Sequence, residues 1–207
     1  MENKITVYYG KMEELLPDHG TESKGERETL AGRRLLYRAL KEQFRMELPE
    51  EPEGLQVLEG LLGKNSHGKP FLVPERACGF MPERNRDRIP FFNISHSERY
   101  AACAVAWFPV GIDIQAIRKI KSPGVIRRTL SMEEQEQVKN APDSDIAFFH
   151  LWAKKESYVK WNGEGITKDL RTLDLKEIWQ EFFQTEDGYV GYVTGEKKTP
   201  VDLIRVV

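Results

Sequence analysis

The stretch YAACAVAWFPVGIDIQ, residues 100–115, restricts the fold of this 207-residue chain more than any other segment. Residues 100–108 are almost entirely apolar and lie between turn-forming segments, which favours a strand. Pro109 has no backbone N–H and therefore ends that strand, and the residues after it begin another. We therefore expect a boundary between two halves, which cover residues 1–109 and 110–207.

Each half is expected to contain one long helix and about three strands. The first helix covers residues 27–44, where leucine and phenylalanine side chains recur at helical spacing. Residues 131–134 have the pattern of a capping box, and a longer helix begins at the acids of residues 143–145 and stops at Gly163. Strands are expected at residues 4–9, 55–59, 91–94, 100–108, 110–114, 171–175, 188–194 and 201–207. This mixture without regular alternation predicts an α+β (mixed α/β) fold.

The segments between these elements are expected to be turns and loops. Residues 10–26 are polar and contain glycine, and residues 63–72 form a turn-rich connection. Residues 73–90 carry three prolines and many charges, so they are predicted to be an exposed excursion. The segment SHSER, residues 95–99, is expected to be the turn between two strands.

Composition and charge exclude several classes of function. Apolar residues make up 40% of the chain and charged residues 31%, which is typical of a soluble globular protein. The formal net charge of -2 provides no general attraction to nucleic acid or to an acidic membrane surface. The two cysteines form no disulfide framework, the first residues lack the apolar core of a signal peptide, and no segment reaches the ~18 apolar residues of a membrane span. We therefore expect a cytoplasmic protein that binds neither nucleic acid nor membrane.

The segment GIDIQ, residues 111–115, places two oxygen-bearing side chains on one face of a strand. Side chains alternate along a strand, so Asp113 and Gln115 point one way while the two isoleucines point the other way. One interpretation is the solvent-exposed face of a half-buried strand. The other is a magnesium site, because Mg²⁺ prefers oxygen ligands and usually takes one or two protein carboxylates. Glu156, on the long helix, would supply the second carboxylate.

The long helix carries a second candidate group. Trp152, Glu156 and Lys160 are spaced by four residues and therefore lie on one helix face. Taken alone, the Glu156–Lys160 pair is most simply an exposed ion pair worth about 0.2–0.5 kcal/mol. Beside Asp113, the same pair would instead contribute a carboxylate and an ammonium to one polar site.

A third group consists of Ser95 and His96 in FFNISHS and of Lys69 in HGKP. A histidine at a turn is usually structural or simply exposed. Serine and histidine side chains also donate hydrogen bonds to phosphate, and a lysine supplies a point charge. These three residues are therefore candidates for binding a phosphorylated ligand.

Four stretches resemble the motifs of one family of enzymes, in the same order and at similar spacing. They are GKP (68–70), FFNISHS (91–97), VGIDIQ (110–115) and LWAKKESYVKWNGEGI (151–166). With these motifs the chain resembles the 4'-phosphopantetheinyl transferase superfamily, and in particular its larger, two-half members. The KES sequence at residues 155–157 is similar to that of the surfactin-synthetase-activating transferases.

The resemblance implies a 4'-phosphopantetheinyl transferase-like fold with two pseudo-symmetric α/β halves and the active site between them. It implies that the 4'-phosphopantetheine group of coenzyme A is transferred to a serine of an apo acyl or peptidyl carrier protein, with release of 3',5'-ADP. The reaction would depend on Mg²⁺, with Mn²⁺ as an alternative metal. A site between two halves of one chain implies a monomer. The basic residues at 118–121 and 127–128 either meet the acidic recognition helix of the carrier protein or are solvated surface charges.

The resemblance also implies a role for each residue of the first two groups. Asp113 and Glu156 match the metal-binding carboxylates of the family, and Glu156 matches the residue that activates the carrier serine. Lys160 matches the lysine beside the leaving phosphate of the coenzyme. Gln115 stands where many relatives have a glutamate. Its neutral amide oxygen is still a ligand for Mg²⁺, but it should bind the ion more weakly.

The remaining candidates are expected to bind the coenzyme. Ser95 and His96 match positions that hold the phosphates of the nucleotide, and Lys69 matches a coenzyme-binding lysine. Arg27, in the first-half helix, is the candidate for binding the 3'-phosphate. Its register stays open because Glu28 occupies the neighbouring position.

Two other functions fit the same residues. A non-catalytic protein of this fold would bind coenzyme A or a carrier protein, with Gln115 marking lost metal chemistry. The presence of Asp113, Glu156 and Lys160 argues against this interpretation, because all three groups needed for transfer remain. A metal-dependent hydrolase would cleave the pyrophosphate of coenzyme A with water and would need no surface for a carrier protein.

Overall fold

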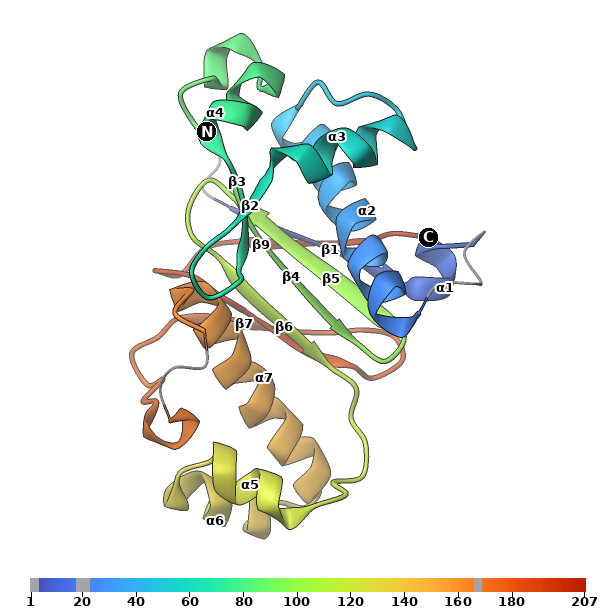
Figure 1. Ribbon diagram of the computed structural model, residues 1–207. Coiled ribbons are helices and arrows are strands. Elements are labelled where there is room, and N and C mark those ends of the chain that lie inside the picture. The colour runs from blue at the N-terminus through green and yellow to red at the C-terminus, as the bar shows by residue number, and fades with distance from the viewer. Residues whose placement is uncertain (1–3, 18–22, 166–168) are drawn as a thin grey trace.

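The structure is a computed structural model that describes residues 4–17, 23–165 and 169–207 (Figure 1). Its strands form two sheets, with the orders β4-β5-β1-β9 and β6-β8-β7, and a separate β2-β3 hairpin. The strands are β1 (Ile5–Lys11), β2 (Leu62–Lys64), β3 (Pro70–Leu72), β4 (Phe91–Ser97), β5 (Tyr100–Ala106), β6 (Gly111–Gln115), β7 (Gln180–Gln184), β8 (Val190–Thr194) and β9 (Val201–Arg205). The helices are α1 (Met12–Leu15), α2 (Lys24–Phe44), α3 (Glu53–Leu61), α4 (Pro74–Ala77), α5 (Pro123–Thr129), α6 (Met132–Asn140) and α7 (Ser144–Asn162).

The two halves of the molecule repeat one topology. β1, α2, β4 and β5 come in this order in the first half, with α1, α3, the β2-β3 hairpin and α4 between them. β6, α7, β7 and β8 come in the same order in the second half, with α5 and α6 between β6 and α7. In each sheet the last of these strands lies in the middle and pairs antiparallel with the other two. The predicted mixed α/β fold with pseudo-symmetric halves is therefore confirmed. The last strand, β9, pairs parallel with β1 and returns the end of the chain to the first sheet.

The apolar sequence of β5 is explained by burial on both faces of the strand. Cys103 packs in one apolar cluster with Leu36 and Leu40 of α2, whereas Ala104 packs in another cluster with Ile112 of β6. Burying each leucine stabilises the fold by about 1.5–3 kcal/mol. The first sheet is thus covered by α2 on one face and contacts the second half of the molecule with the other. Within the described ranges, no helix is long and apolar enough to cross a membrane.

The helix boundaries follow local capping signals. α6 begins at the capping box of Ser131 and Glu134, as predicted. α7 begins at the N-cap Asp143 and ends at Gly163, which has a φ of 76° in the left-handed region that favours glycine. α2 begins earlier than expected, at Lys24, because another capping box precedes it.

Two of the expected strands are absent, and those predictions are wrong. Residues 55–59 belong to α3, which buries Leu58 and Leu61. A short apolar run does not distinguish a strand from a helix by its pattern alone. Residues 171–175 form no strand, and a 3-10 turn occupies their start. β7, which was not predicted, provides one of the two outer strands of the second sheet instead.

Two segments expected to be loops contain regular structure. Within residues 10–26, α1 is helical, and residues 18–22 lie outside the described residues. Residues 73–90 include α4 and two 3-10 turns, and they bury Ala77 and Met81 in the core beside α2. The segment is therefore not the exposed excursion that its prolines and charges predicted. Ile166, the last residue of the fourth motif, also lies outside the described residues.

The strand β4 is longer than expected. It continues through Ser97, so that Ser95 and His96 lie on the strand and not in a turn. The turn to β5 contains only Glu98 and Arg99, and Glu98 has a φ of 51°. The reason is that Ser95 and Ser97 accept hydrogen bonds from backbone N–H groups at β6.

Candidate active site

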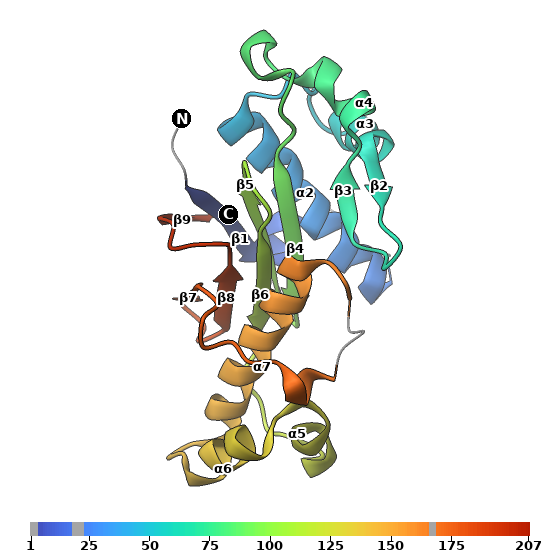
Figure 2. The same cartoon turned by 90° about the vertical axis from the view of Figure 1, so that its left-hand side faces the viewer.

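Polar side chains of β4 join the two halves where β4 lies beside β6 (Figure 2). Asn93, Ser95 and Ser97 each accept a hydrogen bond from a backbone N–H of β6 or of the residue that follows it, at 3.0, 3.2 and 3.0 Å. Because side chains alternate along a strand, all three point from β4 toward β6. Side chains thus hold the two strands together, and we call this line of contact the seam.

Asp113 lies at the centre of the seam, with 2% of its surface exposed. Its Oδ1 accepts hydrogen bonds from the Ser95 hydroxyl at 2.8 Å and from the Lys160 ammonium at 2.7 Å, and its Oδ2 accepts one from the Gln115 amide at 2.8 Å. The same ammonium donates to the Ser95 hydroxyl at 2.8 Å. The isoleucines of GIDIQ are fully buried in a core cluster, so the predicted alternation is confirmed. A buried carboxylate needs such donors, because an unpaired charge in the interior costs several kcal/mol.

Helix α7 packs closely on β6 and brings Glu156 and Lys160 to the seam. Gly111 permits this approach, because a Cβ at its position would lie 2.1 Å from the Ser157 carbonyl oxygen and 2.4 Å from the Trp161 backbone nitrogen. Any larger residue at the start of β6 would push the helix away. The glycine of GIDIQ therefore sets the distance between the helix and the strand that carry the candidate acids.

Glu156 lines a cleft of about 370 Å³ together with Asn93, Lys69 and Lys160. Its Oε1 is buried and has no hydrogen-bond partner among the described residues. Burial raises the pKa of Glu156, and the negative charge of Asp113 adds to this rise, while Lys160 opposes it. A carboxylate with a raised pKa accepts a proton more readily than an ordinary glutamate, as a general base requires.

The β2-β3 hairpin of the first half contacts the C-terminal end of α7. The Asn65 amide donates a hydrogen bond to the Gly163 carbonyl at 3.0 Å, and the Lys69 ammonium donates to the Lys160 carbonyl. The last carbonyls of a helix have no partner within the helix, so these two side chains cap it. Burial lowers the pKa of Lys69. The hairpin thereby forms the wall of the cleft that faces α7.

Two of the predicted site residues, His96 and Arg27, lie on or beside α2 and make no hydrogen bond to Asp113 or Lys160 among those described above. His96 is on β4 with 45% of its side chain exposed, and its Nδ1 lies 3.6 Å from a carboxylate oxygen of Glu28. The Nε of Arg27 is buried and has no hydrogen-bond partner in the part of the chain that the structure describes. The predicted site residues that the structure does bring together at the cleft and the seam are Lys69, Ser95, Asp113, Gln115, Glu156 and Lys160.

The donor set at the seam fits a hard divalent cation. Asp113 and Glu156 provide carboxylates and Gln115 provides an amide oxygen, which are the ligand types that Mg²⁺ takes from proteins. The unpartnered Oε1 of Glu156 is available to a cation without breaking a hydrogen bond to any described residue. Among the described residues, no group of three or more His, Cys, Asp or Glu side chains is placed so that it could hold a metal ion. A cation here would have two acidic ligands and would need oxygen atoms from water or substrate to complete its coordination.

Several residues of the site were missed in the sequence. Asn93 and Ser97 had a usable signal, because polar residues at every second position of an apolar strand indicate a polar partner on one side. Asn65 and Lys155 had none, since both stand among other polar residues in segments that resemble exposed turns or helix surfaces. Their partners lie in distant segments, which no local pattern shows.

The chain matches known proteins along the segment that carries this site. Residues 109–200 match the model of the 4'-phosphopantetheinyl transferase superfamily. A 4'-phosphopantetheinyl transferase of Bacillus subtilis is 32% identical over 134 residues, which cover 61% of this chain and 53% of the relative. The transferase Sfp of Bacillus subtilis (strain 168) is 36% identical over 87 residues, covering 41% and 38%, and gsp of Aneurinibacillus migulanus is 32% identical over 130 residues, covering 61% and 46%.

The resemblance that the motifs predicted is therefore confirmed, and the chain is related to the 4'-phosphopantetheinyl transferase superfamily. The chain spans about half the length of the curated relatives it matches.

Proposed function

We propose that this chain transfers the 4'-phosphopantetheine group of coenzyme A to a serine hydroxyl of an apo acyl or peptidyl carrier protein and releases 3',5'-ADP. The observation that carries the proposal is the meeting of Asp113, Glu156 and Lys160 beside one cleft between the two halves. The names of the matched relatives support the same activity. In this proposal residues 1–109 form the coenzyme-binding side and residues 110–207 carry the metal-binding and catalytic groups.

The proposed reaction needs a base, a charge acceptor and a metal. The carrier serine oxygen attacks the phosphorus that bears the pantetheine arm, and Glu156 accepts the serine proton. The bond from that phosphorus to the oxygen of 3',5'-ADP breaks, and Lys160 stabilises the negative charge that develops there. Mg²⁺, or Mn²⁺ in its place, would be held by Asp113, Glu156 and Gln115 and would neutralise charge on the pyrophosphate.

Four residues besides Lys160 are proposed to bind the coenzyme. Lys69 lines the cleft, and its ammonium would reach a phosphate by leaving the α7 carbonyl. Ser95 would exchange one of its seam contacts for a phosphate oxygen. His96 and Arg27 lie at α2, where the exposed imidazole and the unpartnered guanidinium nitrogen support binding of the 3'-phosphate end.

The surface of the second half is proposed to meet the carrier protein. Arg127 and Arg128 are exposed on α5, and Arg118 and Lys119 are exposed on the segment that follows β6. Arg118 and Lys119 form ion pairs with Glu98 and Asp145. Exposed basic side chains in these segments would attract an acidic recognition helix. We also propose a cytoplasmic monomer, because both cysteines are free and the cleft is built from a single chain.

One assay tests the proposed function. The protein is incubated with coenzyme A, Mg²⁺ and an apo carrier protein, and the carrier is weighed by mass spectrometry. A mass gain of one phosphopantetheine group, abolished by Glu156→Gln, is expected. Release of 3',5'-ADP without a mass gain would indicate a coenzyme A pyrophosphate hydrolase. No turnover with retained binding of coenzyme A would indicate a binding protein.

A further inference from the structure

The residues on either side of Glu156 on α7 are both buried and polar. Lys155 has 1% and Ser157 has 0% of its surface exposed. Successive residues of a helix are separated by about 100° around its axis. Viewed along α7, Lys155 therefore points to one side of Glu156 and Ser157 points to the other side. A polar side chain without a partner would be costly at either position.

Lys155 connects α7 to α6 and to the 3-10 turn at Leu170–Thr172. Its ammonium lies 2.7 Å from Oε2 of Glu134 and donates a hydrogen bond to the Leu170 carbonyl at 2.6 Å. Glu134 is also the acidic member of the capping box that starts α6, where it accepts a hydrogen bond from the Ser131 backbone N–H at 2.7 Å. A charge this deeply buried remains favourable only with well-placed partners. The pair therefore holds this side of α7 at one position against α6.

Ser157 connects the other side of α7 to the central strand β8 and the outer strand β7 of the second sheet. Its hydroxyl lies 2.8 Å from Oγ1 of Thr194, at the end of β8. The amide of Gln180, at the start of β7, donates to Ser157 Oγ at 3.0 Å, to Thr194 Oγ1 at 2.9 Å and to the Lys154 backbone carbonyl at 2.8 Å.

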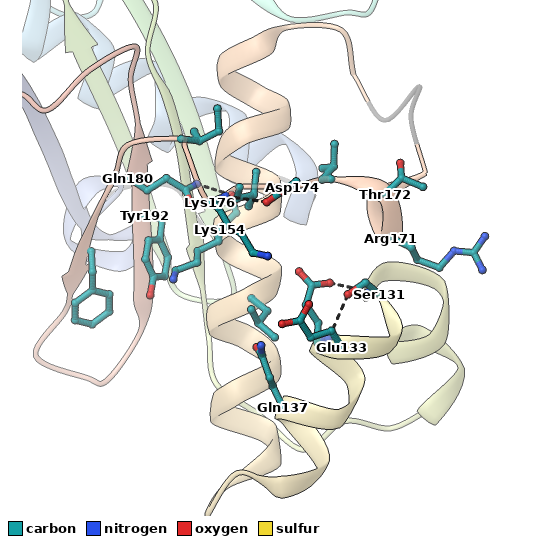
Figure 3. Close-up of a pocket in the computed structure, with 16 residues that line it drawn as sticks. Ser131, Glu133, Gln137, Lys154, Arg171, Thr172, Asp174, Lys176, Gln180 and Tyr192 are labelled. Atoms are coloured by element: carbon teal, nitrogen blue, oxygen red, sulfur yellow. Dashed lines mark hydrogen bonds between the residues drawn. The ribbon is translucent and has the colours of Figure 1, made fainter.

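Glu134 and Gln180, one partner from each set of contacts, line a cavity of about 770 Å³ between α6, α7 and the second sheet. Figure 3 shows Gln180 on the sheet side of α7 and Ser131 on the α6 side, with dashed lines for the bond of Gln180 to Lys154 and for the capping box. On the opposite side, α7 packs closely on β6 at Gly111. The polar contacts of Lys155 and Ser157 therefore add to this packing in holding the helix.

We infer that Lys155 and Gln180 are positioning residues that fix the rotation of α7 and so direct the Glu156 carboxylate into the cleft. The inference rests on the proposed function, because it concerns the geometry of the proposed base. With a side-chain carboxylate roughly 6 Å from the helix axis, a rotation of about 15° moves it by roughly 1.5 Å. A misplacement of about 1 Å costs a reaction on the order of 100-fold in rate. Contacts on both sides of Glu156 oppose rotation in both directions.

The test compares Lys155→Met and Gln180→Leu with Val138→Ala in the full-length protein. Val138 is buried in the apolar cluster between α6 and α7, and its side chain has no polar group, so its truncation controls for lost stability. Transfer to an apo carrier protein is measured well below each variant's Tm, with kcat and KM determined separately. We expect Lys155→Met and Gln180→Leu to lower kcat by about 10- to 100-fold with KM for coenzyme A changed less than about threefold. Val138→Ala should lower Tm and leave kcat within about twofold.

The double variant distinguishes positioning from a general loss of stability. Both sets of contacts restrain one rotation, so the kcat loss of Lys155→Met/Gln180→Leu should be well below the product of the two single losses. If Lys155→Met does not fold, Gln180→Leu, at the less buried start of β7, carries the test. Wild-type kcat in both single variants would overturn the inference. It would also be overturned if Val138→Ala lowered kcat as much as the two variants do for the same decrease in Tm. Absence of transfer by the wild-type protein would instead overturn the proposed function.

Discussion

The ammonium of Lys160 lies 2.7 Å from Oδ1 of Asp113, which connects helix α7 to strand β6 by a charged contact at the edge of the cleft. The side chain of Asp113 is 2% exposed, whereas that of Lys160 is 27% exposed. The carboxylate is thus fixed inside the protein and the ammonium is accessible from the cleft. Lys160 can move toward a ligand phosphate while Gln115 continues to hold Asp113.

Lys160→Met is therefore expected to reduce both stability and transfer. It leaves Asp113 buried with two neutral donors, which should cost about 1–3 kcal/mol of unfolding free energy. Loss of the charge beside the leaving phosphate should lower kcat by about 10²- to 10³-fold. Urea unfolding and carrier mass analysis measure the two effects. Lys154→Met, on the same helix but with its ammonium over the Tyr192 ring, should change stability by about 1 kcal/mol or less and leave kcat unaltered.

Gln115→Glu should destabilise the metal-free protein and strengthen the binding of Mg²⁺. The amide of Gln115 now donates to Oδ2 of Asp113, and a glutamate would replace this donor with a second negative charge. In EDTA we expect a loss of about 1–2 kcal/mol. With Mg²⁺ present, the added carboxylate should reduce the half-saturating Mg²⁺ concentration by about 3- to 10-fold.

Thermal unfolding in EDTA and in MgCl₂, and a Mg²⁺ titration of transfer, measure these changes. Gln137→Glu adds the same charge on the exposed side of α6 and is the matched control. If Mg²⁺ dependence is the same in wild type and Gln115→Glu, Gln115 does not face the metal.

Local signals explain which parts of the fold and of the site were predictable from the sequence. The ends of α7 were predicted because Asp143 and Gly163 act on neighbouring backbone groups. The two faces of β6 were predicted because the alternation in GIDIQ is itself local. The motif resemblance added the roles of Glu156 and Lys160, which their spacing alone would have assigned to a surface ion pair.

The errors and omissions arise from interactions between distant segments. β4 was predicted to stop at residue 94 because a serine and a histidine usually mark a turn, yet Ser95 and Ser97 bond to β6 instead. Lys155 stands in the charged sequence KKES and would be expected in solvent, but Glu134, 21 positions away, makes its burial possible. Such pairings become visible only when the fold brings the partners together.

Replacing Arg127 and Arg128 by glutamate should weaken the use of the carrier protein and leave the use of coenzyme A unchanged. Both side chains are exposed on α5, away from the residues that line the cleft. Reversing two charges should raise KM for an acidic carrier by about 10-fold at low salt, and the effect should shrink as added salt screens the charges. Steady-state kinetics with each substrate varied in turn measure this.

The matched control for this prediction is Lys197→Glu/Lys198→Glu. These lysines are also adjacent and exposed, but they lie between β8 and β9. The control should leave both KM values within about twofold of wild type. Equal increases in KM for carrier protein and coenzyme A in the α5 variant would show that α5 does not bind the carrier.

Glu156→Gln should remove transfer and alter the pH dependence of stability in the metal-free protein. Burial raises the pKa of Glu156 above its ordinary value of 4.5. As pH rises above 4.5, the carboxyl of the unfolded chain loses its proton first, while the folded protein retains it up to its own, higher pKa. The unfolded state then binds fewer protons than the folded state, so the contribution of Glu156 to stability falls as pH rises through this interval. A glutamine does not titrate, and the stability of Glu156→Gln relative to wild type should therefore increase over the same interval and then level off.

Urea unfolding in EDTA between about pH 4.5 and 8 measures the difference, with Glu133→Gln on the exposed side of α6 as the control for loss of one carboxylate. Parallel pH curves for wild type and Glu156→Gln would show that this carboxyl is solvated in the folded protein, and the proposed base would lose its physical basis.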